Sequence, residues 1–178
     1  KALHCKRACK KLWKKRWPSC PSPRSCSTSS RLIASCQAAK EAKPKLQIEI
    51  TNVADLSALV GIQNATYVIE EVGGNPEETY RALAIFKGSE DRSCPRLNHP
   101  SRVMYVGSSR TDVKNRLAQH IGDGPKSTYA LHLKHWFKGS YKITVTQYDV
   151  PHEVLQILED DLADRLKPAF GKRGGNNR

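Results

Sequence analysis

The fold is decided by residues 103–120, VMYVGSSRTDVKNRLAQH. The first part of this stretch is apolar, β-branched and aromatic up to Gly107, which predicts a buried strand. In the second part apolar residues return every fourth position, at Val113, Leu117 and Ile121. That spacing is typical of an amphipathic helix. The stretch therefore predicts a strand, a tight turn and a helix.

Three polar side chains are expected where this strand and helix meet. Arg116 and His120 are four residues apart, so they lie on one face of the helix beside its apolar row. Tyr105 belongs to the strand. A guanidinium, an imidazole and a phenol can therefore converge at one junction.

The rest of the chain predicts a small mixed α/β (α+β) domain over residues 45–178. Further strands are expected at 46–50, 65–72 and 141–148, and further helices at 53–60, 76–86, 128–137 and 151–166. Asn52 is expected to cap the first of these helices, and Lys167 and Pro168 to end the last. Residues 88–102 are polar and contain two prolines, so they predict a loop.

The formal net charge of +13 is not a property of this domain. Residues 1–45 hold thirteen Lys or Arg against one acid, whereas residues 46–178 hold seventeen against sixteen. The domain is therefore nearly neutral, and the basic charge of the whole chain is no evidence that the domain binds nucleic acid. It indicates only that the N-terminal segment would bind phosphate in a salt-dependent way.

The N-terminal segment, residues 1–44, predicts mostly disorder, with a short helix near residues 34–43. It suits a nucleic-acid-binding arm, an organellar targeting segment, or sequence foreign to the functional protein. Its five cysteines lack zinc spacing, and Cys94 alone makes no disulfide scaffold, so a cytoplasmic, reducing compartment is expected. No run approaches the ~18 apolar residues that a membrane span needs, so neither a span nor a membrane partner is expected.

The last helix carries five acids, of which Glu159 and Asp161 flank the apolar row on opposite sides. Helical geometry does not decide between them. One carboxylate can hold a hard cation such as Mg²⁺, Arg donates two hydrogen bonds to phosphate, and a phenol or imidazole accepts a proton. The set therefore indicates phosphate-handling chemistry.

These motifs resemble the GIY-YIG nuclease superfamily over roughly residues 65–172. The resemblance rests on YVG at 105–107, on Arg116 and His120 in R-x₃-H spacing, and on an acid in a late helix that ends LKP. ATYVI at 65–69 takes the place of the GIY strand. The resemblance implies a three-stranded antiparallel sheet flanked by helices, and hydrolysis of DNA with one Mg²⁺ or Mn²⁺.

The resemblance also implies a role for each site residue. Tyr67 would hydrogen-bond within the site, Tyr105 would act as the general base or position the water, and Arg116 would bind the scissile phosphate. His120 would orient groups or relay protons, and Glu159 would be the metal ligand. Basic residues near these positions are expected to contact DNA: Arg110, Lys114, Lys172 and Arg173.

Two departures from the family pattern stand out. Tyr67 and Tyr105 are 38 residues apart, so residues 73–102 are expected to form an insertion, which could carry substrate specificity. The family's late asparagine falls at Gly171, and Asn176 or Asn177 are the candidates to replace it. The leading hypothesis is a metal-dependent DNA endonuclease. The alternatives are a nucleic-acid-binding module of the same fold without turnover, and an unrelated α/β protein.

Overall fold

The computed structural model describes residues 25–89 and 91–171. Its helices and strands follow one another in the order α2 (Ser25–Glu41), β1 (Pro44–Ile50), η1 (Val53–Leu59), β2 (Ala65–Val72), α3 (Pro76–Ser89), β3 (Val103–Ser109), α4 (Val113–Ala118), η2 (Gln119–Asp123), η3 (Leu133–His135), β4 (Ser140–Tyr148) and α5 (His152–Leu166). The chain is thus mixed α+β, as predicted, and the strand, turn and helix expected within residues 103–120 are β3 and α4.

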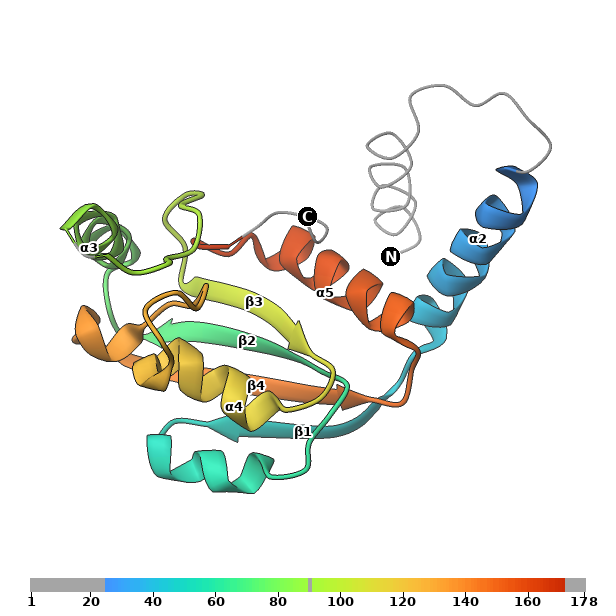
Figure 1. Cartoon of the computed structure of the whole chain (residues 1–178), viewed down its shortest axis with the longest axis horizontal. Helices are drawn as coiled ribbons and strands as arrows, with labels where there is room; N and C mark the ends of the chain where they lie inside the picture. Colours follow the sequence, from blue (N-terminus) through green and yellow to red (C-terminus); the bar gives the residue numbers. More distant parts are fainter. Residues whose placement is uncertain (1–24, 90, 172–178) are drawn as a thin grey trace.

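The sheet has four antiparallel strands in the order β1-β4-β2-β3 (Figure 1). The three strands expected from the family resemblance correspond to β4, β2 and β3, so the expected strand number is wrong by one. The additional strand, β1, pairs with β4 through Ile48 and Val145. Its alternating sequence had predicted a strand at 46–50, and pairing with β4 satisfies its backbone groups on one side.

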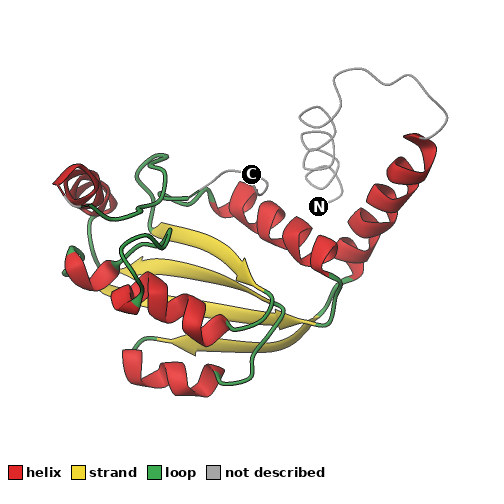
Figure 2. Ribbon diagram, viewed as in Figure 1, coloured by secondary structure: helices red, strands yellow, loops and turns green. Residues whose placement is uncertain are grey.

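Helices cover both faces of the sheet (Figure 2). The face toward α4 carries the main core, which includes Tyr67, Ile69 and Leu117. On the opposite face, Val68 and Val106 pack with Leu162 of α5. Successive residues of β2 therefore bury side chains on both sides, as the period of a strand requires.

Two expected helices differ from the structure. Residues 128–137 do not form one helix, since only a short turn, η3, is helical, and His132 before it has a left-handed backbone with φ +55°. A left-handed residue cannot continue a right-handed helix. The helix expected at 53–60 is the 3₁₀-helix η1, and the Asn52 side chain makes no capping hydrogen bond.

Residues 25–41 of the N-terminal segment form α2, a longer helix than the one expected near 34–43, so the prediction of disorder is wrong there. α2 contacts α5 before the chain enters β1 (Figure 1). The disorder predicted for residues 1–24 lies outside the described residues. None of the helices in the described part of the chain is long and apolar enough to cross a membrane.

The outer edge of β3 is covered along only part of its length. Backbone N–H groups of Ala169 and Phe170, after α5, donate to the carbonyls of Val103 and Met104 at 2.8 and 2.9 Å. The Asn98 side chain holds this C-terminal segment by donating to the carbonyls of Pro168 and Gly171. The covered part of the β3 edge ends at Met104, and the β3 residues from Tyr105 onward line a pocket.

Candidate functional site

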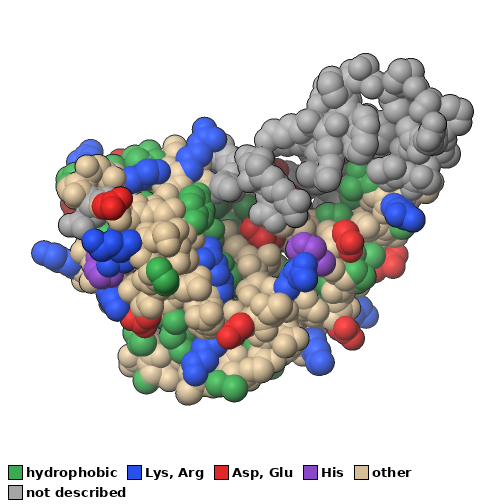
Figure 3. Space-filling model, in the orientation of Figure 1, with side chains coloured by type: hydrophobic (Ala, Val, Ile, Leu, Met, Phe, Trp, Pro, Cys, Tyr) green, Lys and Arg blue, Asp and Glu red, His purple; other side chains and the backbone are tan. Residues whose placement is uncertain are grey.

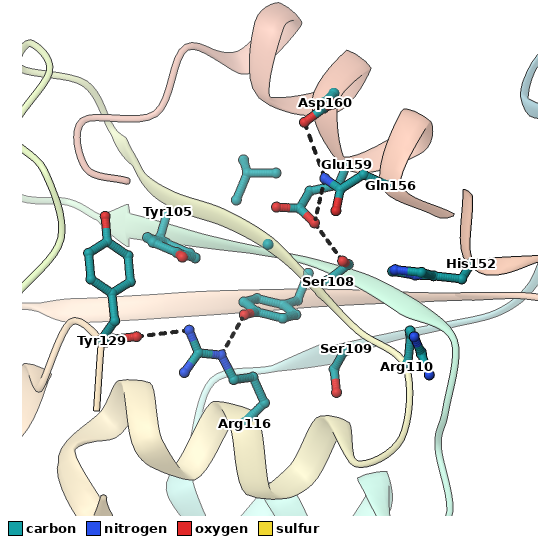
Figure 4. A pocket seen from close by; sticks show the side chains of 13 residues that line it. Tyr105, Ser108, Ser109, Arg110, Arg116, Tyr129, His152, Gln156, Glu159 and Asp160 are labelled. Atoms are coloured by element: carbon teal, nitrogen blue, oxygen red, sulfur yellow. Dashed lines mark hydrogen bonds between the residues drawn. The ribbon is translucent and has the colours of Figure 1, made fainter. Parts of the chain in front are cut away.

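A pocket of about 380 Å³ surrounds the open part of the β3 edge, between α4 and α5. Successive residues of β3 point to opposite faces of the sheet, so this strand contributes to the pocket from both sides. Arg116 of α4 lines it from one face and Glu159 of α5 from the other (Figure 4). Figure 3 shows the same face hollowed, with basic and acidic side chains near the hollow.

The wall formed by α4 is tightly hydrogen-bonded. Arg116 Nε donates to the Tyr67 hydroxyl at 3.3 Å. Its terminal nitrogens donate to Gln119 Oε1 and to the Tyr129 carbonyl, both at 2.9 Å. These bonds use three of the five guanidinium N–H groups and leave one on each terminal nitrogen. The α4 wall thus holds the guanidinium in place while keeping hydrogen-bond donors for a ligand.

Asp112 starts α4 and so helps to place Arg116. Its carboxylate accepts the backbone N–H of Asn115 at 2.9 Å, the hydrogen bond of a helix N-cap. The apolar row of α4 is anchored by Val113 and Leu117, both fully buried. Capping and burial together fix the face on which the guanidinium lies.

His120 lies behind the pocket and does not line it. Its ring is fully buried, and Nδ1 accepts the backbone N–H of Leu131 at 3.3 Å. A backbone N–H can only donate, so the proton of the neutral ring is on Nε2, which lies 3.1 Å from the Tyr67 hydroxyl. Burial, reinforced by the Arg116 charge, lowers the pKa of His120 well below its usual value. His120 is therefore a neutral donor to Tyr67.

The two phenols lie side by side, with ring centroids 6.3 Å apart. Burial raises the pKa of Tyr67 to about 12, against the opposing effect of Arg116. The pKa of Tyr105 is raised further, first by burial and then by Tyr67. The Tyr67 oxygen accepts N–H groups from both Arg116 and His120, so it is the phenol better prepared to carry negative charge.

The wall formed by α5 presents Glu159. Its Oε2 accepts the Ser108 hydroxyl at 2.5 Å and the Gln156 amide at 3.5 Å. Burial raises the pKa of Glu159, opposed by the Ser108 hydrogen bond. Asp161, the competing acid, instead accepts from Arg165 on the same helix at 3.0 Å and does not line the pocket. Of the two acids, the structure places Glu159 beside Arg116.

Gly107 keeps the pocket open next to the tyrosines. A Cβ atom at this position would lie 2.6 Å from the Tyr67 hydroxyl oxygen and 2.9 Å from the Tyr105 ring. Both are closer than real contacts allow, and pairing of β3 with β2 fixes the position of Gly107 in the sheet. The glycine of YVG is therefore needed for the two rings to pack against β3.

Of the expected catalytic residues, Tyr67, Tyr105, Arg116 and Glu159 line one pocket, and His120 supports it from behind. Among the expected DNA contacts, Arg110 lines the pocket, whereas Lys114 is exposed on α4 away from it. The other expected residues lie outside the described part of the chain: Lys172, Arg173, Asn176 and Asn177.

The expected late-asparagine position, Gly171, has a left-handed backbone with φ +114° and packs against the Tyr105 ring. A side chain is strained in this conformation, so an asparagine at 171 would not fit the segment as it is folded. The amide that contacts this segment comes from Asn98 instead. The end of the expected insertion is therefore part of the support of the site.

Sequence patterns did not single out three pocket residues on α5, His152, Gln156 and Asp160, nor Ser108 and Ser109 on β3 and Tyr129 before η3. Helical spacing held the signal for the first three. Gln156 precedes Glu159 by three residues, and His152 and Asp160 are each four residues from Gln156, so all lie along one helix face. Ser108 directly follows YVG, but its contact with Glu159 of α5 could not be predicted before the position of α5 on the sheet was known.

The donor set suits a hard cation bound through one protein carboxylate. Glu159 Oε1 has no hydrogen bond to the described residues, and Asp160 lines the same wall. Mg²⁺ is commonly held by one or two carboxylates together with water and substrate phosphate. Among residues 25–89 and 91–171, no group of three or more His, Cys, Asp and Glu side chains forms a site made of protein ligands alone.

No family model, curated protein or solved structure matches this chain.

Proposed function

We propose that this protein is a metal-dependent endonuclease that hydrolyses phosphodiester bonds in DNA, and that it belongs to the GIY-YIG superfamily. One observation carries the proposal. Arg116 and Glu159 come from helices on opposite faces of the sheet, and both line one pocket together with the phenols of Tyr67 and Tyr105. A cationic donor, a carboxylate and a proton acceptor are the groups that phosphodiester hydrolysis requires.

In this mechanism Arg116 binds the scissile phosphate. The two N–H groups that Tyr67, Gln119 and Tyr129 do not accept can each donate to a non-bridging phosphate oxygen, which is the paired geometry that guanidinium groups favour. The Glu159 carboxylate would hold Mg²⁺ or Mn²⁺, and the hydroxyl of Ser108 fixes one of its oxygens by a hydrogen bond. When bound, the cation would polarise the phosphate and stabilise the charge that develops in the transition state.

A phenolate accepts the proton of the attacking water. The family resemblance assigns this step to Tyr105, but the hydrogen bonds favour Tyr67. As a phenolate, the Tyr67 oxygen would keep two N–H donors, from Arg116 and His120, and would retain a lone pair for the water proton. Tyr105 packs on Tyr67 and His120 and would then orient the reacting groups.

A second candidate function is a DNA-binding module of the same fold without turnover. Burial raises the pKa of both tyrosines, so both phenols are protonated at neutral pH unless a cation and a phosphate change their surroundings. Gly171 in place of the family's late asparagine also favours this alternative.

Incubation of supercoiled plasmid with Mg²⁺ or Mn²⁺ tests the proposal. We expect nicking by the wild type, and loss of nicking by Arg116→Ala and Glu159→Gln. Arg165→Ala is the matched control, because Arg165 is on the outward side of α5. Binding of the plasmid without cleavage would support the DNA-binding module. The absence of both binding and cleavage would contradict both proposals.

A further inference from the structure

The open part of the β3 edge presents backbone donors to the pocket. Asn64 N–H donates to the Arg110 carbonyl at 3.0 Å. In an antiparallel ladder hydrogen-bonded pairs alternate with pairs that are not bonded, and the register then makes 66/108 and 68/106 the bonded pairs. The N–H groups of Gly107 and Ser109 therefore point away from β2, toward the pocket that both residues line.

Two side chains extend this donor surface beyond Ser109. Arg110 directly follows β3 and His152 begins α5, and both are exposed and line the pocket. Figure 4 shows them near Ser109, at the end of the pocket away from Tyr105. Within residues 25–89 and 91–171, neither side chain has a hydrogen bond or ion pair. Both are therefore available to a ligand.

Charge distinguishes this end of the pocket from the rest. The acids that line the pocket are Glu159 and Asp160, which Figure 4 places on the α5 wall beyond Gln156 from His152. Arg110 is a permanent cation, and the imidazole of His152 can donate a hydrogen bond in either protonation state. An anion is thus favoured beside Ser109, and a cation beside Glu159.

We propose that Ser109 N–H, Arg110 and His152 form a second phosphate-binding subsite, which holds the phosphate next to the cleaved one on the same nucleic-acid strand. This inference rests on the proposed function, since it takes the scissile phosphate to lie on Arg116. Gly107 marks the Arg116 end of the pocket, because a Cβ atom on it would lie 2.6 Å from the Tyr67 hydroxyl oxygen that Arg116 contacts. Gly107 and Ser109 are two β-strand residues apart, about 6.8 Å, which is similar to the spacing of consecutive phosphates along one nucleic-acid strand. The substrate is therefore a polynucleotide rather than a single phosphodiester.

Removal of one phosphate charge at a time tests the subsite. The probes are duplex oligonucleotides that carry a neutral methylphosphonate at the linkage on one or the other side of the cleaved bond. In the wild type, we expect one of these to raise KM about tenfold, the effect of losing one charged hydrogen bond. Arg110→Ala should raise KM for the unmodified oligonucleotide by a similar factor, with a smaller rise for His152→Ala.

Combining the Arg110→Ala variant with the methylphosphonate probe tests whether Arg110 binds the neighbouring phosphate. If Arg110 binds that phosphate, the methylphosphonate should raise the KM of Arg110→Ala by less than twofold, because the partner charge is already absent. Full additivity of the two effects would overturn the proposal. So would an equal loss on bis(4-nitrophenyl) phosphate, which has no neighbouring phosphate. Arg165→Ala is the control for the general loss of a positive charge.

The subsite and the nuclease proposal can fail separately. If the wild type binds the oligonucleotides without cleaving them, the same combination is measured as Kd by fluorescence anisotropy. Non-additive losses then support the subsite in a protein without turnover. Cleavage with additive losses would contradict the subsite alone, and absence of binding would contradict both.

Discussion

The two walls of the pocket are built differently. On the α4 side, Arg116, Tyr67 and His120 are joined by hydrogen bonds, and the His120 ring is fully buried between Leu131 and Tyr67. On the α5 side, Glu159 keeps one carboxylate oxygen without a partner among the described residues. The hydrogen bonds of the α4 wall contribute to the stability of the fold, whereas the α5 wall leaves a carboxylate oxygen available for a ligand. Changes in the two walls should therefore have separable effects on activity and on stability.

The largest effect is expected in the α4 wall. Arg116→Ala should lower the rate of plasmid nicking by about 10³-fold, since the phosphate loses a preorganised cationic donor. The same change removes a hydrogen bond from Tyr67 and two more from its neighbours, so it should also lower Tm. Nicking assays and thermal unfolding measure the two effects. An unchanged Tm would contradict the structural part of the contrast.

In the α5 wall, Glu159→Gln should lower nicking by about 10²-fold and leave Tm unchanged or higher. Burial raises the pKa of Glu159, so the folded state disfavours the ionised carboxylate, and a neutral amide removes that cost. In the wild type, nicking should decline as pH falls through this raised pKa, because the cation needs the carboxylate. A pH–rate profile whose acidic limb lies at the ordinary glutamate value would contradict this account.

His120→Asn, in the α4 wall, should lower stability, in contrast to Glu159→Gln. We expect a loss of about 2 kcal/mol of unfolding free energy. The pKa of His120 is lowered in the folded state, so between that pKa and about 6.5 the unfolded chain binds the extra proton. The unfolding free energy of the wild type therefore falls as pH drops below about 6.5. Urea unfolding at pH 7.5 and 5.5 should show a smaller drop in the variant, and equal drops would contradict the assignment.

The smallest effect concerns the support common to both walls. Asn98→Ala removes two hydrogen bonds to the carbonyls of Pro168 and Gly171 and should cost about 1–2 kcal/mol. Because Gly171 packs on Tyr105, the tyrosine fluorescence or the NMR signals of that ring should also change. Asn115→Ala is the control, because Asn115 is exposed on α4 and its side chain makes no hydrogen bond to the described residues. Equal stability of the two variants would show that the segment is held by its backbone alone.

Local sequence patterns predicted the elements that carry the site. The apolar run before Gly107, the fourfold spacing from Val113 and the stop at Lys167 depend on neighbouring residues, and the structure has all three features. Lys167 ends α5 with a left-handed backbone, φ +50°. The convergence of Tyr105 and Arg116 followed from the same short stretch.

Features set by distant parts of the chain were not predictable in this way. His132 takes a left-handed backbone within a helical pattern, and the residues before it contact distant side chains: the Tyr129 carbonyl accepts from Arg116, and the Leu131 N–H donates to His120. The choice between Glu159 and Asp161 needed the position of α5 on the sheet. The length of β3 edge that stays open depends on Ala169 and Phe170, which cover its start by pairing with Val103 and Met104, more than sixty positions earlier.

The half-covered edge of β3 has a consequence for self-association. An exposed strand edge can pair with the same edge of another molecule, and proteins limit this with short edges, charges and coverage. Here the Ala169–Phe170 pairing shortens the free edge, and Arg110 adds charge at its end. A chain truncated before residue 168 would expose the whole strand, and intermolecular strand pairing, rather than simple loss of activity, would be its characteristic defect.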